Sequence, residues 1–329
     1  MPLDLNRSED QRQILDAVGS ALGESYPMSR LRAEGHDDLG PIADLGVFGL
    51  ALPEDAGGIG LTAVEEMLVH TMLGRHAIST RALATSLGAR LAAEMGHVEL
   101  AQSMVSGARS ACAGIPTGDG IMLIDPGNAD LVLVFEADGL ALSSIENVAS
   151  EELDGLGNGL PTRLCRLDAK NSLARVTGGA LRTLADLLIC AHLLGAAEAA
   201  RDLAVSYAKV RQQFGRPIGA FQAIKHHCAN MAVSCEVLSA QLDMAAIALR
   251  DGRTDAEFQV AALARLAPRL ALENARTCIQ VHGGMGFSAE ADAHHYLKSV
   301  HVLRQFLSET TLLELTAPLA PHTIRSERG

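Results

Sequence analysis

The sequence predicts an α+β protein that is mostly helical, with an N-terminal helical domain (residues 1–105), a reduced central β domain (106–178) and a C-terminal four-helix bundle (179–329). Three observations carry this prediction. Apolar residues recur at helical spacing near both ends of the chain, the middle is rich in Gly, Pro, Asn and Asp around one compact β-like run, and the 48% hydrophobic content allows a sizeable core.

The first 105 residues carry two capping-box patterns, Ser8-x-x-Gln11 and Thr62-x-x-Glu65, which mark helix starts. The stretch LPEDAGGIGL (52–61) is a Gly-rich connector between helices. In the middle region, Leu131 to Phe135 form an apolar β-like run that ends before an Asp138-Gly139 turn signal. We therefore expect a small β region between two helical domains.

The C-terminal part contains four predicted helices. The first covers 181–212, and the second carries one apolar stripe from Phe221 to Leu249. A third begins at a Thr254-x-x-Glu257 capping box and runs past Pro268 to a stop at Gly283. A fourth is expected at about 291–317, which makes a four-helix bundle the economical arrangement.

Composition excludes several function classes. A net charge of −12 argues against nucleic acid or anionic membranes as main partners. We see no N-terminal signal pattern and no apolar run near the length that spans a bilayer, so we expect a cytoplasmic protein. The six cysteines show no C-x-x-C spacing, and the histidine doublets cannot chelate through both members of a helix, so we expect no metal site.

Two motifs carry functional information. Residues 210–226, VRQQFGRPIGAFQAIKH, form a basic, turn-rich break between the first two bundle helices. Residues 280–286, QVHGGMG, place three glycines after the third helix. Each has a purely structural explanation, since basic residues favour the negative end of a helix dipole and a glycine often caps a helix. Three glycines nevertheless exceed the need of one cap and allow a ligand to approach the backbone.

Taken together, R-x-x-F-G-R-P-I-G-x-F-Q followed about 60 residues later by Q-x-H-G-G-x-G-F resembles the C-terminal domain of the acyl-CoA dehydrogenase family. Residues 52–76, LPEDAGGIGLTAVEEMLVHTMLGRH, are similar to a segment of that family's N-terminal domain. The resemblance implies a flavoenzyme fold that binds FAD without a covalent bond. It also implies that one subunit grips the ADP end of its neighbour's flavin, here through Arg211, Phe214, Gln222, Gln280, Gly283 and Gly284.

The sequence departs from the family at the catalytic base. Family members use a Glu to remove the proton alpha to the thioester, and its two known positions correspond to Leu307 and Ala185 here. Asp186 and Glu309 lie one and two residues away and are candidates for a displaced base, but we expect exposed helix carboxylates at both. Residues 112–123, CAGIPTGDGIML, replace the family's T-E-P-x-x-G-S-D loop, and the chain has no Trp. We therefore expect that this chain lacks the residues with which family members hold the flavin ring.

These departures predict a subunit without its own catalytic Glu that contributes an FAD half-site to a longer, base-bearing homologue, in a heterotetramer resembling those of bacterial steroid degradation. A self-sufficient homomeric acyl-CoA dehydrogenase with a displaced base, such as Glu198 or Glu236, is the alternative. A flavin-free scaffold on the same fold is a third. The low aromatic content of 3% fits a wide pocket for a bulky acyl-CoA but does not identify it.

Overall fold

A computed structural model describes residues 7–29, 31, 38–153 and 160–308 of the chain. Both predicted capping boxes of the N-terminal region are confirmed: Gln11 N donates to Ser8 Oγ over 3.1 Å, and Thr62 and Glu65 exchange the equivalent bonds. The helices of this region are α1 (Glu9–Ser25), α3 (Gly40–Asp44), α4 (Ala63–Arg75), α5 (Thr80–Glu94) and α6 (Val98–Val105).

The middle of the chain folds into a seven-stranded sheet with the order β5-β6-β2-β1-β3-β4-β7. The predicted run Leu131–Phe135 is confirmed as β3, and its five residues are buried. All strand pairs are antiparallel except β1 with β3. The other strands are β1 (Ala111–Thr117), β2 (Gly120–Ile124), β4 (Gly139–Ser144), β5 (Ser150–Leu153), β6 (Thr162–Cys165) and β7 (Ser172–Thr177). The sheet is larger than the sequence suggested, because strands such as β5 and β6 carry too many polar residues to be recognised.

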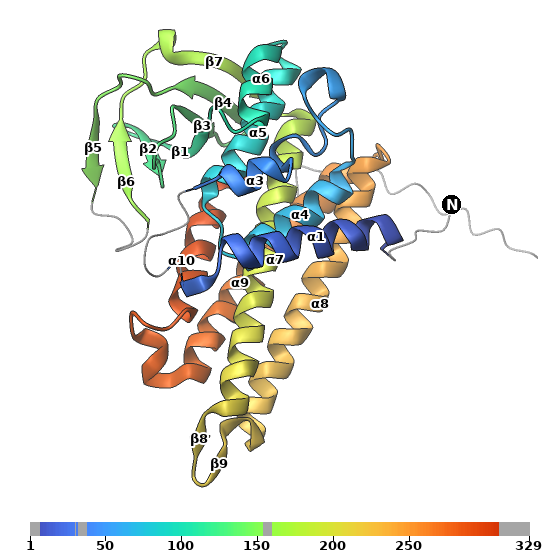
Figure 1. Ribbon diagram of the computed structural model, residues 1–329, viewed down its shortest axis with the longest axis vertical. Coiled ribbons are helices and arrows are strands. Elements are labelled where there is room, and N and C mark those ends of the chain that lie inside the picture. The colour runs from blue at the N-terminus through green and yellow to red at the C-terminus, as the bar shows by residue number, and fades with distance from the viewer. Residues whose placement is uncertain (1–6, 30, 32–37, 154–159, 309–329) are drawn as a thin grey trace, which may run out of the picture.

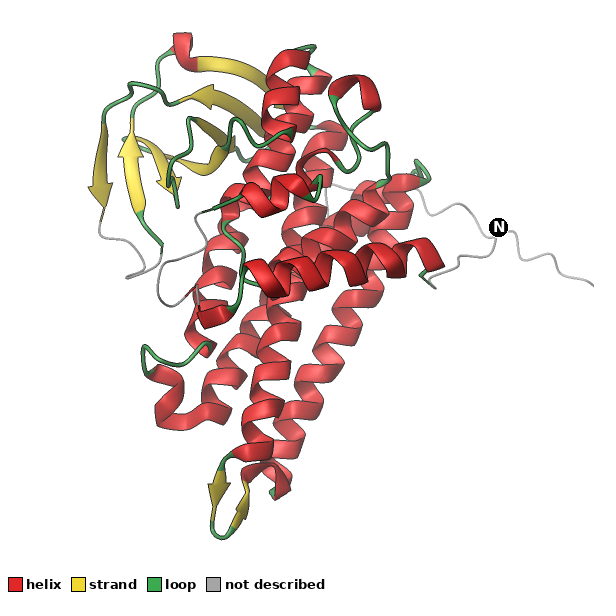
Figure 2. Cartoon of the chain, in the orientation of Figure 1, coloured by secondary structure: helices red, strands yellow, loops and turns green. Residues whose placement is uncertain are grey.

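Four helices form the C-terminal part: α7 (Gly179–Val210), α8 (Gln222–Arg250), α9 (Ala256–His282) and α10 (Ala293–Leu303). Figure 1 shows α7, α8 and α9 running along the length of the molecule, with the sheet at one end and the short β8–β9 hairpin (Gln212–Gln213 and Arg216–Pro217) at the other. Figure 2 shows the same separation of strands from the long helices. α7 therefore connects two distant regions of the chain.

Two predictions for the bundle are wrong. Thr254 does not cap α9; the helix begins after Asp255, whose carboxylate is bound by Arg253 at 2.8 Å instead. The fourth helix is shorter than 291–317, because α10 ends at Leu303 and a 3-10 turn over Arg304–Phe306 follows. Residues 309–329, and with them Glu309, lie outside the described residues.

The long bundle helices differ in how much of their apolar surface is covered. Two helices, α7 and α8, are long and apolar enough to cross a membrane by length and composition alone, which is weak support for a span. The sequence prediction considered only uninterrupted apolar runs and therefore missed them. In α7, 89% of the most apolar window is buried, as in a core helix, whereas in α8 the buried share is 39%. One side of α8 thus remains open.

Candidate functional site

The R-x-x-F-G motif forms a hairpin that projects beyond the end of α7. Gln213 pairs with Arg216 across the hairpin, so Phe214 and Gly215 make a two-residue turn. Both turn residues have positive φ, +53° and +75°, as the tight hairpin turn of type I′ requires. Gly adopts this conformation easily, but a bulky Phe does so rarely, and such strain is often found at functional sites. The Phe214 ring is 91% exposed.

The glycines that follow α9 have different structural reasons. Gly283 has φ +61° and ψ −138°, a conformation that other residues avoid. A Cβ on Gly286 would lie 2.6 Å from the carbonyl oxygen of Ile279, so that glycine allows the turn to fold back on the helix. Gly284 has neither constraint, and a Cβ there would meet nothing within 4 Å in the described part of the chain. The chain's own packing therefore does not explain Gly284.

The structure brings the two motifs to the same end of the bundle. The ring of Tyr207, at the end of α7, stacks on His282, at the end of α9, with centroids 4.2 Å apart. The Phe221 ring, just before α8, contacts the Phe214 ring edge-on at 6.1 Å and lies 4.2 Å from the Arg216 guanidinium. Sequence reasoning missed these contacts, although aromatic residues beside both motifs in a chain with only three Tyr and seven Phe were an available signal.

The six predicted site residues are all exposed: Arg211, Phe214, Gln222, Gln280, Gly283 and Gly284. Among the residues that the structure describes, no side chain bonds to the guanidinium of Arg211 or to the amides of Gln222 and Gln280. The hairpin segment is basic, because no Asp or Glu occurs between Asp202 and Glu236, whereas Glu290 and Asp292 follow the glycine turn. This end of the bundle thus offers unpaired donors and positive charge to an anion.

The opposite end of α7 is closed. Ser308 donates to Asp186 through its backbone N at 3.0 Å and its Oγ at 2.6 Å, so the two segments that carry Ala185 and Leu307 lie side by side. Asp186 also pairs with Arg182 at 3.1 Å, and both side chains are less than 10% exposed. The expectation of an exposed Asp186 is therefore wrong. The i, i+4 spacing of Arg182 and Asp186 could have indicated the pair.

The buried pair is held by further contacts. Arg182 Nη2 donates to the carbonyl oxygen of Phe306 at 2.7 Å, and its guanidinium lies 5.9 Å from the Phe135 ring. Burial raises the pKa of Asp186, while the Arg182 charge and the Ser308 hydrogen bonds act against that rise. Because its oxygens are occupied by Arg182 and Ser308, Asp186 is not free to take a proton from a substrate.

The other candidate bases divide into three cases. Glu198 is bound by Arg75 at 2.8 Å, and Glu236 is exposed on α8. Glu66, which sequence reasoning missed, is buried on α4 with its Oε2 unpartnered. Burial raises the pKa of Glu66 to about 7, against the opposing charge of Arg90. Among these three, Glu66 has the environment best suited to a general base.

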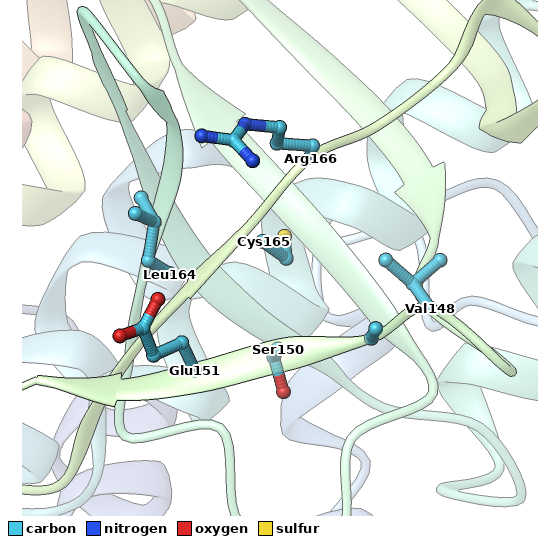
Figure 3. A pocket seen from close by; sticks show the side chains of 7 residues that line it. Val148, Ser150, Glu151, Leu164, Cys165 and Arg166 are labelled. Carbon is cyan, nitrogen blue, oxygen red and sulfur yellow. The ribbon is translucent and has the colours of Figure 1, made fainter.

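The segment that replaces the predicted flavin-ring loop is a tight hairpin. Thr117 at the end of β1 pairs with Gly120 at the start of β2, so only Gly118 and Asp119 remain between the strands. A hollow of about 400 Å³ lies elsewhere on the sheet, over β5 and β6, with Glu151, Cys165 and Arg166 in its lining (Figure 3). This hollow contains none of the six predicted site residues.

Sequence comparisons agree with this architecture. The family model "Acyl-CoA dehydrogenase, N-terminal domain" matches residues 8–110, and "Acyl-CoA dehydrogenase, C-terminal domain" matches 184–306. Acyl-CoA dehydrogenase IpdE2 of Mycolicibacterium smegmatis is 30% identical over 91% of this chain and 94% of its own length. Acyl-CoA dehydrogenase FadE34 of Mycobacterium tuberculosis is 34% identical over 81% of this chain, but the match spans only 39% of FadE34.

Solved structures give the same fold. The Tcur3481–Tcur3483 steroid ACAD, in a G363A variant, superposes with a TM-score of 0.78 at 24% identity, covering 93% of this chain and 96% of that one. The ChsE4–ChsE5 complex from Mycobacterium tuberculosis superposes with a TM-score of 0.74 at 25% identity, covering 92% and 94%. Each of these names pairs two proteins, Tcur3481 with Tcur3483 and ChsE4 with ChsE5. The similarity extends over the helical regions and the sheet alike.

Proposed function

The chain belongs to the acyl-CoA dehydrogenase family, and from this premise we propose that it is a subunit that completes the FAD site of a base-bearing partner chain. In this proposal the partner supplies the catalytic carboxylate, and this chain holds the ADP part of the partner's FAD. When bound, FAD accepts the hydride from the beta carbon of an acyl-CoA thioester. The reaction of the complex is then the α,β-dehydrogenation of that thioester.

The contrast between the two ends of α7 carries the proposal. At one end, Ala185 and Leu307 supply no carboxylate, and Asp186 is occupied by Arg182 and Ser308. At the other end, Arg211 is exposed, and its guanidinium bonds to no side chain of the described residues. A chain that used its own active site would need a carboxylate near Ala185 and Leu307 that is free to accept a proton.

The chemistry of the exposed end suits a pyrophosphate. A guanidinium binds phosphate oxygens through two parallel hydrogen bonds, and no carboxylate pairs with the Arg211 guanidinium among the described residues. Gly284 leaves its backbone open to close approach by a group from outside the described chain. The amides of Gln222 and Gln280 add donors and acceptors for the remaining polar atoms of the ligand. These residues therefore fit the ADP part of FAD.

A different acyl-CoA dehydrogenase chain is the proposed partner. The similar structures include the ChsE4–ChsE5 complex and the Tcur3481–Tcur3483 steroid ACAD, and each of these names pairs two different proteins. We extend this to a heterotetramer that acts on a bulky, steroid-like acyl-CoA. The open side of α8, where Val233 is 62% and Val237 44% exposed, gives the partner apolar side chains on the same helix as Gln222.

The test is to purify the chain alone and together with its base-bearing homologue, and to measure bound flavin by absorbance and mass. We expect no flavin on the lone chain and about one FAD per heterodimer. Arg211→Met should raise the FAD dissociation constant of the complex by roughly tenfold to a hundredfold, as loss of a charged hydrogen bond predicts. Arg175→Met, at an exposed arginine of β7, is the matched control and should leave it unchanged.

A lone chain that carries one FAD and oxidises an acyl-CoA would instead support a homomeric enzyme. Glu66 favours that second candidate, because it is a buried carboxyl with a pKa of about 7 and an unpartnered oxygen. It lies one helical turn before His70, which contacts His192 of α7 at 3.0 Å. In that case Glu66→Gln should abolish turnover, whereas under the first proposal it leaves turnover of the complex intact.

A further inference from the structure

We propose that the stacked pair Tyr207–His282 holds the R-x-x-F-G hairpin and the glycine turn in register, so that Arg211 and Gly284 form one binding surface. This inference rests on the proposed half-site and assigns Tyr207 and His282 as its positioning residues. Neither needs to touch the FAD. Their role is to fix two segments that are about 70 residues apart in the sequence.

Each ring is attached directly to one segment of the half-site. Arg211 N donates to the carbonyl oxygen of Tyr207 at 2.9 Å, so Tyr207 lies one turn before the hairpin on α7. His282 is the last residue of α9 and immediately precedes Gly283. The rings are 4.2 Å apart between centroids and inclined by 23°, which is a stacked geometry. A displacement of either ring therefore moves one half of the site relative to the other.

The orientation of His282 is fixed from three sides. Its Nδ1 lies 2.7 Å from the carbonyl oxygen of Cys278, and because a carbonyl only accepts, Nδ1 carries the proton. The turn folds back against the start of the side chain, since a Cβ on Gly286 would lie 3.0 Å from His282 Cβ. The third side is the Tyr207 ring. His282 is consequently buried, although Gly283 and Gly284 beside it are exposed.

Phe221 connects the hairpin to α8 in the same way. The Phe221 ring contacts both Phe214 and Arg216. Phe221 itself directly precedes Gln222, the first residue of α8. The Tyr207–His282 stack joins α7 to α9, so the two aromatic contacts together link all three segments that carry the six predicted residues. Such prior ordering matters because each side chain immobilised on binding lowers the affinity. A half-site that is already ordered avoids most of this loss.

The test compares Tyr207→Leu, which removes the ring, with Tyr207→Phe, which keeps it. The Tyr207 hydroxyl has no hydrogen-bond partner among the described residues, so Tyr207→Phe isolates the stack. Hydrogen exchange on the free chain should rise about tenfold at 212–216 and 283–287 in Tyr207→Leu and stay unchanged in Tyr207→Phe. The FAD dissociation constant of the complex should rise about tenfold in Tyr207→Leu only.

Phe306→Leu is the matched control, because Phe306 stacks on Phe135 at 4.7 Å at the other end of α7. It should leave exchange in the hairpin and the glycine turn unchanged. The proposal is overturned if Tyr207→Leu changes neither exchange nor FAD affinity, or if Tyr207→Phe is as impaired as Tyr207→Leu. If exchange responds as expected but the wild-type complex holds no FAD, the coupling stands and the proposed half-site function is rejected.

Discussion

The two ends of α7 present charged groups in opposite ways. At the N-terminal end, the side chains of Arg182 and Asp186 are 5% and 7% exposed and bind each other, Ser308 and Phe306. At the C-terminal end, roughly 45 Å away along the 32-residue helix, Arg211 is exposed and its guanidinium has no partner among the described residues. The charged groups of the closed end bind one another and the chain's own backbone, although Arg182 Nε and Nη1 have no hydrogen-bond partner among the described residues, whereas the guanidinium at the open end is available to another molecule.

Stability explains only the closed end. A buried charge needs a partner, so the contacts of Asp186 follow from burial itself. An exposed arginine needs none, and a hairpin with Phe214 at positive φ gains nothing for the fold. The strain and exposure at the open end are therefore better explained by binding than by folding.

Of the substitutions that test this contrast, removal of the Asp186 carboxylate should have the largest effect, a loss of stability. Asp186→Ala leaves Arg182 buried without its carboxylate, and we expect the free energy of unfolding to fall by about 3–5 kcal/mol in urea denaturation. The control is Glu136→Ala, which removes the exposed pair with Arg175 and should cost under about 1 kcal/mol. If the two substitutions lowered the free energy of unfolding equally, the Arg182–Asp186 pair would not be buried as the structure describes.

Glu66, which is buried on α4, should make the stability of the fold depend on pH. Its pKa rises from 4.5 to about 7 on folding, so its stabilising contribution is complete below pH 4.5 and lost as pH rises through 7. The stability of wild type relative to Glu66→Gln should thus fall by about 3 kcal/mol across that range, measured by denaturation at several pH values.

Glu65 provides a control of opposite sign for that measurement. Burial alone would raise its pKa, but hydrogen bonds from Thr62 and Gln11 lower it. Its stabilising contribution is therefore present above pH 4.5 and lost on acidification. The stability of wild type relative to Glu65→Gln should thus increase as pH rises. If both variants showed the same slope, the environment assigned to Glu66 would be incorrect.

Two glycines after α9 should have different roles, Gly286 in stability and Gly284 in FAD binding, and the expected effects are the smallest of those predicted. Gly286→Ala forces a Cβ against Ile279 and should destabilise the chain by about 1–3 kcal/mol in thermal unfolding. Gly284→Ala should change stability by less than about 0.5 kcal/mol, since its surroundings are open. In the complex, however, Gly284→Ala should weaken FAD binding about tenfold. Unchanged FAD affinity in Gly284→Ala would argue against close approach at that residue.

Sequence patterns predicted the parts of the fold that depend on local spacing. The capping boxes at Ser8 and Thr62, the strand at 131–135 and the long helices are local, and the structure confirms them. The three-domain division and the assignment of the six FAD-binding residues stay predictions. The burial of Asp186 could not be found in this way, because it depends on Ser308, which is 122 residues away. Periodicity shows which side chains share a helix face, but it does not show which distant segment covers that face.

The β8–β9 hairpin has a consequence for how such subunits evolve. Its turn is closed by its own backbone pairing, and Phe214 at the tip is 91% exposed. Substitutions at the tip therefore leave the bundle core untouched. If the chain assembles with a partner as proposed, exchanging a few residues in this hairpin would be a simple route by which duplicated chains stop recognising each other's partners.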